Sequence, residues 1–189
     1  SALYSNLDAG KAQTVVAYGT SLTAFGAWVQ QLGDDLNQRY PGRATVINSG
    51  KGSMWSGWGV ENLDSRVISK SPDTVFIEFA VNDAFVPNNT TVEQARKNLE
   101  LMIDRIKAAK SSTEIILTVT NPVIGASAVQ RPQLRDYFQM YRDVATARGL
   151  RLIDNYPRWE AVLKSNPDLF NQYVADGLHP NADGYRAVV

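Results

Sequence analysis

Three side chains suited to nucleophilic catalysis occur in two short stretches at opposite ends of this 189-residue chain. Ser21 follows the apolar run Val15–Tyr18 and Gly19, and Asp176 precedes His179, the only histidine, by three residues. This spacing allows the Asp176 carboxylate to accept a hydrogen bond from one ring nitrogen of His179, which leaves the other nitrogen free to face a serine hydroxyl. A serine activated in this way can attack a carbonyl carbon.

Ser21 lies at a predicted junction between a buried strand and a helix. The run Val15–Tyr18 is apolar and short enough for a strand, and Gly19 ends it. A backbone N–H at the amino end of a helix lies in a positive field, which favours a nucleophile whose product is an oxyanion. Thr20, Ser21 and Thr23 could alternatively serve only as helix caps. The D-x-x-H pattern before a C-terminal helix favours the catalytic interpretation.

Five predicted strands alternate with helices along the chain. The strands cover residues 14–19, 44–47, 73–79, 114–119 and 150–153, and helices are predicted at 23–40, 60–69, 92–110, 132–148, 159–164 and from 181 onward. Thr90 with Glu93 and Thr91 with Gln94 match overlapping capping boxes before the third helix. The alternation is typical of an α/β fold with a parallel sheet and helices on both faces, preceded by an extended lead-in. Residues 1–189 contain no repeat or linker, so one domain is predicted.

Three polar features follow the carboxyl ends of predicted strands, which is where parallel α/β sheets bind their ligands. Besides Ser21 they are Asn82 and the loop 48–59, whose sequence NSGKGSMWSGWG contains four glycines and two tryptophans. The Asn82 amide can donate a hydrogen bond to an oxyanion, as amides do in acyl-transfer sites, or can simply cap a turn. The shared position at one sheet edge favours a common site.

Composition excludes several classes of function. Lys plus Arg and Asp plus Glu each total 19, so the formal net charge is zero, which argues against nucleic acid or an anionic membrane surface as the main target. No apolar run approaches the roughly 20 residues of a membrane span. The chain has no cysteine and one histidine, which excludes disulfides, cysteine nucleophiles and a His/Cys metal site, and no cofactor is expected.

The two ends of the chain carry expectations of their own. The start at Ser1, without a methionine, is compatible with the removal of a signal peptide, a tag or a neighbouring domain, and so with a secreted or periplasmic protein. Val189 falls early in the last predicted helix, so we expect this helix to be truncated and the natural chain to continue.

Short blocks in the sequence, taken in order, resemble those of the SGNH hydrolases, also called the GDSL esterase family. The stretch Gly19–Leu22 is similar to the family's G-D-S-L block, and Ala80–Asp83 is similar to its G-x-N-D block. Asp176 and His179 match its D-x-x-H block. The resemblance extends from the first predicted strand to the last helix.

One further block of the family, N-x-x-x-x-G, is only partly present. Counting from Asn48 places Ser53 at the position of the glycine, with Gly52 directly before it. Thr20 replaces the usual aspartate of the first block, which is not a triad residue, and Ala80 replaces a glycine. The resemblance therefore leaves open whether Gly52 or Ser53 supplies a backbone N–H to an oxyanion.

The resemblance implies a flavodoxin-like three-layer α/β/α sandwich and an esterase that works through an acyl-serine intermediate. It implies that Ser21 attacks the carbonyl carbon, that His179 accepts the proton, and that Asp176 orients the imidazole. It also implies the donors that hold the oxyanion: the N–H of Ser21, the N–H of Gly52 or Ser53, and the amide of Asn82.

The substrate is the least specified part of the expected function. Trp55 and Trp58 are predicted to contact it, because flat indole faces pack well against sugar rings. Few aliphatic residues lie near the motifs, which favours a small acyl group, acetyl, on a carbohydrate. Both tryptophans could instead pack inward and anchor their loop. Alternative functions are a lysophospholipase or thioesterase and, outside the hydrolases, a flavin-binding or glycan-binding module.

Overall fold

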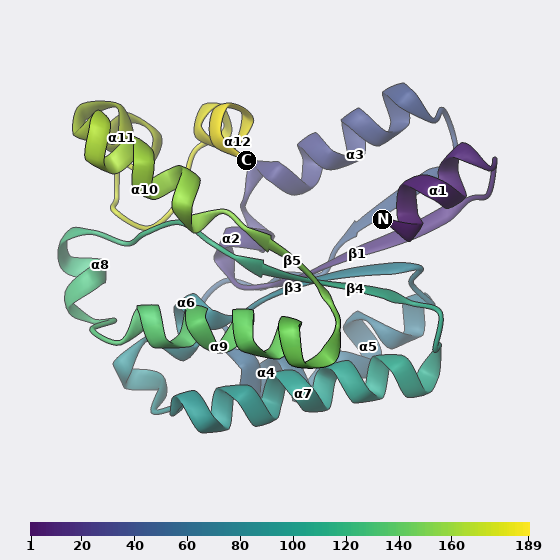
Figure 1. Cartoon of the computed structure of the whole chain (residues 1–189), viewed down its shortest axis with the longest axis horizontal. Helices are drawn as coiled ribbons and strands as arrows, with labels where there is room; N and C mark the ends of the chain where they lie inside the picture. The colour runs from purple at the N-terminus through teal and green to yellow at the C-terminus, as the bar shows by residue number, and fades with distance from the viewer.

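The sheet of the computed structural model, which describes residues 1–189, has five parallel strands in the order β2-β1-β3-β4-β5 (Figure 1). The strands are β1 Gln13–Gly19, β2 Ala44–Asn48, β3 Thr74–Glu78, β4 Glu114–Val119 and β5 Arg151–Asp154. β1 and β3 are buried along nearly their whole length because helices cover both faces, which explains their apolar sequences. The predicted α/β fold is confirmed, and this strand order is that of flavodoxin-like sheets.

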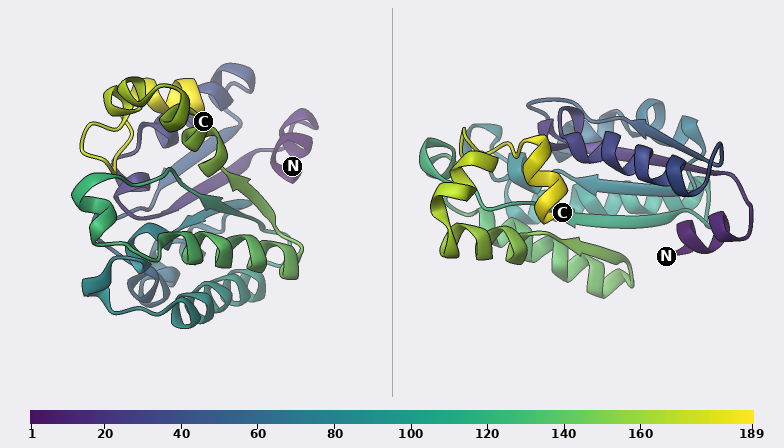
Figure 2. Two further views of the ribbon diagram at one scale, coloured as in Figure 1. Left: turned by 60° about the vertical axis from the view of Figure 1, so that its left-hand side comes forward. Right: turned by 90° about the horizontal axis from the view of Figure 1, so that it is seen from above.

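Helices form a layer on each side of the sheet, as the views in Figures 1 and 2 show. One layer contains α4 (Ser56–Glu61), α5 (Leu63–Arg66), α7 (Val92–Ala109) and α9 (Leu134–Arg148). The other contains α1 (Ala2–Asp8), α3 (Ala27–Arg39), α10 (Tyr156–Ser165), α11 (Pro167–Tyr173) and α12 (Ala182–Val188). Short elements lie in the connections: α2 (Ser21–Ala24), α6 (Ala80–Asp83), α8 (Gly125–Val129), η1 (Ile68–Lys70) and η2 (Val86–Asn88).

The long helix α7 shows how the sequence pattern determines the packing. Thr91 Oγ1 accepts a hydrogen bond from the Gln94 N–H at 3.1 Å, so one of the two predicted capping boxes begins the helix. The buried residues of α7 recur every one to four positions on one face: Ala95, Leu99, Met102, Ile103 and Ile106. They belong to a core of 26 buried residues between this helix layer and the sheet. A second cluster of eight buried residues packs α1 and α3 against the opposite face.

The helix predicted at residues 23–40 is wrong as a single element, because α2 ends at Ala24 and α3 begins at Ala27. The chain bends at Gly26, where a Cβ atom would lie 1.9 Å from the Leu22 oxygen, so the bend requires glycine. The Leu22 oxygen accepts a hydrogen bond from the Trp28 indole N–H at 2.9 Å. This break limits α2 to one turn behind the predicted nucleophile.

Three further segments differ from the prediction. Residues 1–13 are not extended throughout, because they include α1 with its two buried leucines. α11 occupies a stretch in which no helix is predicted, and it is begun by the Asn166 cap and by Pro167. The helix predicted at 60–69 is shifted and divided into α4, α5 and η1. None of the helices combines the length and the apolar character that a membrane span requires.

Candidate active site

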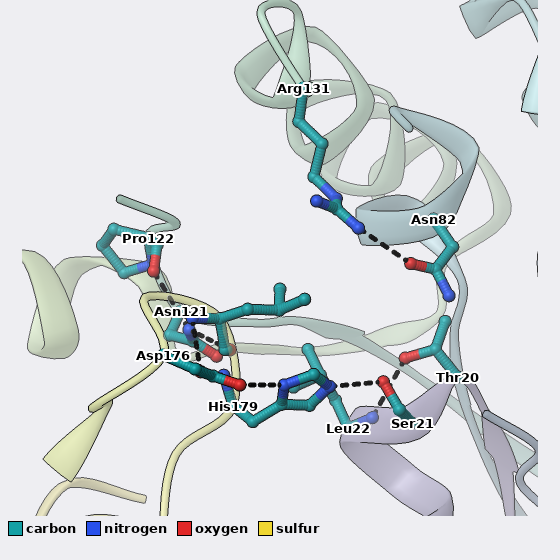
Figure 3. Close-up of polar contacts among 10 residues, drawn as sticks. Thr20, Ser21, Leu22, Asn82, Asn121, Pro122, Arg131, Asp176 and His179 are labelled. Atoms are coloured by element: carbon teal, nitrogen blue, oxygen red, sulfur yellow. Dashed lines mark hydrogen bonds and ion pairs between the residues drawn. The ribbon is translucent and has the colours of Figure 1, made fainter. Parts of the chain in front are cut away.

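Ser21, His179 and Asp176 form a hydrogen-bonded chain beyond the carboxyl end of β1 (Figure 3). Ser21 is the first residue of α2, and its Oγ lies 2.8 Å from His179 Nε2. The Nδ1 of His179 lies 2.6 Å from Asp176 Oδ2. When Nδ1 carries the proton that bonds to the carboxylate, Nε2 is free to accept the proton of Ser21. The two distant stretches of sequence thus place the predicted nucleophile, base and orienting carboxylate within hydrogen-bonding distance of one another.

The turn from Asp176 to His179 is built around one carboxylate. Asp176 Oδ1 accepts hydrogen bonds from the N–H of Leu178 at 2.9 Å and of His179 at 2.7 Å, while Oδ2 holds the ring. Burial raises the pKa of the Asp176 carboxyl, but these hydrogen bonds outweigh it and bring the pKa below its usual value. Gly177 has a φ of +77°, and a Cβ there would lie 2.5 Å from the Ile124 oxygen, so the turn requires glycine. Asp176 therefore stays ionised while it orients the imidazole.

Thr20 and a buried carboxylate fix the turn that presents Ser21. Thr20 Oγ1 accepts a hydrogen bond from the Leu22 N–H at 3.2 Å and so caps α2. Glu78, at the end of β3, accepts hydrogen bonds from the Thr20 N–H at 2.7 Å, the Thr20 hydroxyl at 2.9 Å and the Thr23 hydroxyl at 2.7 Å. Threonine thus replaces the aspartate of the G-D-S-L block without loss of a cap.

A cleft of about 380 Å³ surrounds Ser21 and His179. Ten residues line it: Ser21, Phe25, Gly52, Ser53, Asn82, Phe85, Asn88, Arg131, Leu178 and His179. The backbone N–H groups of Ser21, Gly52 and Ser53 donate to no acceptor within the protein. Asn82 Nδ2 donates one hydrogen to the Met54 oxygen at 2.8 Å and has a second hydrogen available. The structure therefore brings all the predicted oxyanion donors to the cleft that contains the nucleophile.

Other features of the structure do not compete with this cleft. A larger cavity of about 480 Å³ lies between the sheet and the helices α1, α3 and α12, and it contains neither Ser21 nor His179. No group of three or more His, Asp or Glu side chains gathers where it could hold a metal ion. The hydrogen-bonded triad, rather than the size of a cavity, identifies the candidate active site.

A family model for the GDSL-like lipase/acylhydrolase family matches residues 15–187, which include every block described above. The chain belongs to this family. It is accordingly a carboxylic ester hydrolase. Membership does not favour a flavin-binding or glycan-binding module.

Solved structures with the same fold cover nearly the whole of this GDSL-like acylhydrolase. A lipase/acylhydrolase from Enterococcus faecalis is 28% identical, with a TM-score of 0.78 over 93% of this chain and 90% of that chain. An alpha/beta hydrolase enzyme from the metagenome of Lake Arreo is 22% identical, with a TM-score of 0.79 over 94% and 92%. An acetylxylan esterase from Geobacillus stearothermophilus is 19% identical, with a TM-score of 0.78 over 93% and 90%. The comparison with curated proteins finds no match.

The two tryptophans predicted to contact substrate lie away from the cleft of the GDSL-like acylhydrolase. Trp58 packs against the core, with its ring centre 5.8 Å from that of Tyr18, because α4 turns it toward the sheet. Trp55 precedes α4, and its indole lies against Gly57, where a Cβ would be 2.6 Å from Nε1. Neither tryptophan lines the cleft. Trp58 therefore fits the alternative in which the side chain packs inward, whereas the half-buried Trp55 packs within its own loop.

Ser53, which stands where the family has glycine, adopts the left-handed backbone conformation with a φ of +65°. This conformation costs a non-glycine residue about 1–2 kcal/mol, while glycine costs about 0.5–1 kcal/mol more in chain entropy on folding. We therefore expect Ser53→Gly to raise the free energy of unfolding by about 0.5 kcal/mol and to leave kcat unchanged, because the backbone N–H remains. Urea unfolding and an esterase assay measure the two effects. Ser53→Ala keeps the strain and is the control; equal stability of both variants would contradict the prediction.

Two buried acids lie beneath the site. Burial raises the pKa of Glu78 from its usual 4.5 to about 7, against the hydrogen bonds from Thr23 and Thr20, and the neighbouring charge of Asp83 adds to the increase. Burial likewise raises the pKa of Asp83 from its usual 3.8 to about 7, against the hydrogen bonds from Ser56. Both carboxyls therefore hold protons in the folded protein at pH values where the unfolded chain has released them.

These two carboxyls should make the fold less stable as the pH rises from about 5 to about 8. An acid whose pKa is raised by folding binds more protons in the folded state, so the free energy of unfolding falls with pH between the two pKa values. The expected decrease is up to about 3 kcal/mol for each carboxyl. Urea unfolding across this pH range measures it. Glu78→Gln mimics the protonated side chain and should remove the Glu78 share of the decrease, which leaves that of Asp83; an equally steep profile in this variant would contradict the prediction.

Several residues of the site are not apparent from the sequence. For Glu78 the sequence does contain a signal. It is a single acid within the apolar run TVFIEF, so it has to find hydrogen-bonding partners when the strand is buried. Arg131 gives none, because it lies in a connection and contacts Asn82 across 49 positions of sequence. Phe25 reaches the cleft only because the chain breaks between α2 and α3.

Proposed function

We propose that this esterase hydrolyses esters of small acyl groups, acetyl above all, that are carried on a carbohydrate. The observation that carries the proposal is the aligned triad in an open cleft of about 380 Å³, which has to hold both the acyl group and the nearest part of the alcohol. Ligand pockets commonly span about 300–1,000 Å³, so this cleft is at the small end of the range. A short acyl group leaves room for a bulky alcohol that extends into solvent.

In the proposed reaction each of these groups has one role. Ser21 Oγ bonds to the carbonyl carbon while His179 Nε2 accepts its proton. The carbonyl oxygen becomes an oxyanion, stabilised by the N–H of Ser21, the N–H of Gly52 or Ser53, and the Asn82 amide. As the tetrahedral intermediate collapses, the bond to the alcohol oxygen breaks and His179 gives its proton to that oxygen. A water molecule then attacks the acyl-serine with His179 as its base, which releases the acid and restores Ser21.

Phe25 supports a carbohydrate as the alcohol. Its side chain is 80% exposed at the rim of the cleft, beside the Gly52 backbone. A flat exposed ring packs well against the C–H face of a sugar, which is the role that the sequence suggested for the tryptophans. Asn88 and Arg131 line the same cleft and bring polar groups that can face hydroxyls. The acetylxylan esterase that shares this fold makes acetylated xylan the first polysaccharide to test.

A series of p-nitrophenyl esters from acetyl to octanoyl, with acetylated xylan alongside, tests the proposal. We expect kcat/KM to be highest for acetyl and to decrease with chain length, and acetate to be released from the polysaccharide. Phe25→Ala should raise KM for acetylated xylan more than for p-nitrophenyl acetate, while Phe25→Trp, which retains a flat ring, should not. A preference for octanoyl esters would refute the small-acyl part, and an unchanged KM in Phe25→Ala would refute the sugar contact.

A further inference from the structure

Arg131 places a buried positive charge in the catalytic cleft, yet all its hydrogen bonds go to neutral oxygens. The residue is 8% exposed. Nε donates to the Val81 oxygen at 2.7 Å, Nη1 to the Ser127 oxygen at 3.1 Å and Nη2 to Asn82 Oδ1 at 3.4 Å. The ring of Phe85 lies 4.9 Å from the guanidinium carbon. Burial of a charge without a counter-ion is unfavourable, and Arg131 makes no ion pair that would offset it. Its placement therefore needs another explanation.

Arg131 helps to fix the backbone that carries Asn82. α6 is only four residues long, so its carbonyl groups lack most of the partners that a longer helix would provide. Arg131 Nε binds the oxygen of Val81, the residue directly before Asn82. On the other side, Asn88 Nδ2 donates to the oxygen of Asn82 itself at 2.8 Å. The two contacts hold the peptide groups on both sides of the Asn82 side chain.

The direction of the Asn82 amide is set by two neighbours, the Arg131 guanidinium and the Met54 carbonyl oxygen. The oxygen and nitrogen ends of an amide have nearly the same shape, so hydrogen bonds decide which end faces which neighbour. Arg131 has donors only, and Asn82 Oδ1 faces it (Figure 3). Nδ2 consequently points away from the guanidinium, donates one hydrogen to the Met54 oxygen and keeps the other for the cleft. A flipped amide would place N–H groups against the guanidinium and an acceptor where the oxyanion forms.

We propose that Arg131 is a positioning residue of the oxyanion hole, which holds the Asn82 amide with its N–H toward the cleft. The inference rests on the proposed function, in which Asn82 is an oxyanion donor. The positive charge beside Oδ1 also polarises the amide, so that Nδ2–H is a stronger donor to the negative charge of the transition state. Arg131 acts on the reaction through Asn82 and not through direct contact with the reacting atoms.

The first test is the kinetics of Arg131→Met, which keeps an unbranched side chain but removes the charge and the donors. Because Arg131 acts through Asn82, this variant cannot lower kcat for p-nitrophenyl acetate by more than removal of the Asn82 amide does, which is about 10²–10³-fold. We expect kcat to fall on the order of 10-fold, with KM changed less than about twofold. Arg131→Lys keeps a charge but cannot bridge Val81 and Asn82, so it should be intermediate. Titration of Ser21 with a fluorophosphonate gives kcat per folded, competent site.

A double-mutant cycle with Asn82→Ala separates positioning from a general structural effect. In that background Arg131→Met should change kcat less than about twofold, because no amide remains to be oriented. Equal losses in both backgrounds, or a parental kcat in Arg131→Met alone, would overturn the proposal. A rise in KM confined to anionic esters would assign Arg131 to recognition of substrate charge and would overturn it too.

Two further results keep the test decisive. If Arg131→Met does not fold, Arg131→Lys carried through the same cycle gives the answer. Hydrolysis retained by Ser21→Ala would refute the proposed function itself, whereas a normal kcat in Arg131→Met beside a strongly impaired Asn82→Ala would refute only the positioning role.

Discussion

Replacing Ser21 with alanine should lower kcat for p-nitrophenyl acetate by on the order of 10⁶-fold. The Ser21 hydroxyl is the group that contacts His179 Nε2, and alanine leaves neither a nucleophile nor a proton for the base to accept. The fold should persist, because the side chain that caps α2 is that of Thr20. An esterase assay measures the loss, and thermal unfolding should give a Tm close to that of the parent.

Covalent labelling locates the nucleophile independently of the rate. A fluorophosphonate should add to Ser21 in the parent, as peptide mass spectrometry would show, and should not add to the Ser21→Ala variant. Ser53→Ala is the matched control, because it also removes a serine hydroxyl from the cleft but leaves the triad intact. Labelling at a different residue, together with activity in Ser21→Ala, would place the nucleophile elsewhere.

The strands can be predicted because each carries a local signal, whereas their order cannot. β1 is an apolar run ended by Gly19, but its pairing with β3, with Val15 opposite Thr74, joins segments that are far apart in sequence. α1 escapes prediction because two buried leucines four positions apart are too few for a periodic pattern. The bend at Gly26 depends on its close approach to the Leu22 carbonyl, which the sequence does not reveal.

The hydrogen-bonded arrangement of Ser21, His179 and Asp176 can be predicted because most of its geometry is local. Asp176 and His179 share one turn, and Ser21 comes just after Thr20 at the carboxyl end of β1, the sheet edge at which parallel α/β sheets bind ligands. The rest of the cleft comes from connections that only folding brings together, as the contact of Arg131 with Asn82 illustrates. An aromatic residue in a predicted loop can face either substrate or core. Trp58 faces the core because it lies in α4, which turns its side chain toward the sheet.

Replacing Asn82 with alanine should lower kcat by about 10²–10³-fold, the usual result of losing one oxyanion donor. KM should change little, because the donor acts on negative charge that develops in the transition state. Asn82 is 6% exposed, and alanine also removes the hydrogen bonds that its side chain makes with the Met54 oxygen and with Arg131 Nη2. Asn82→Ala therefore combines the loss of an oxyanion donor with a disturbed loop.

Asn82→Asp makes the separation, because it preserves the shape of the side chain but replaces the N–H donor with an oxygen and adds a negative charge. An aspartate facing Arg131 gains a charge-assisted hydrogen bond, so the variant should resist thermal unfolding better than Asn82→Ala. A carboxylate cannot donate to the oxyanion and repels it, so kcat should fall at least as far as in Asn82→Ala. A stable Asn82→Asp variant with near-parental kcat would show that Asn82 supports a turn and does not stabilise the transition state.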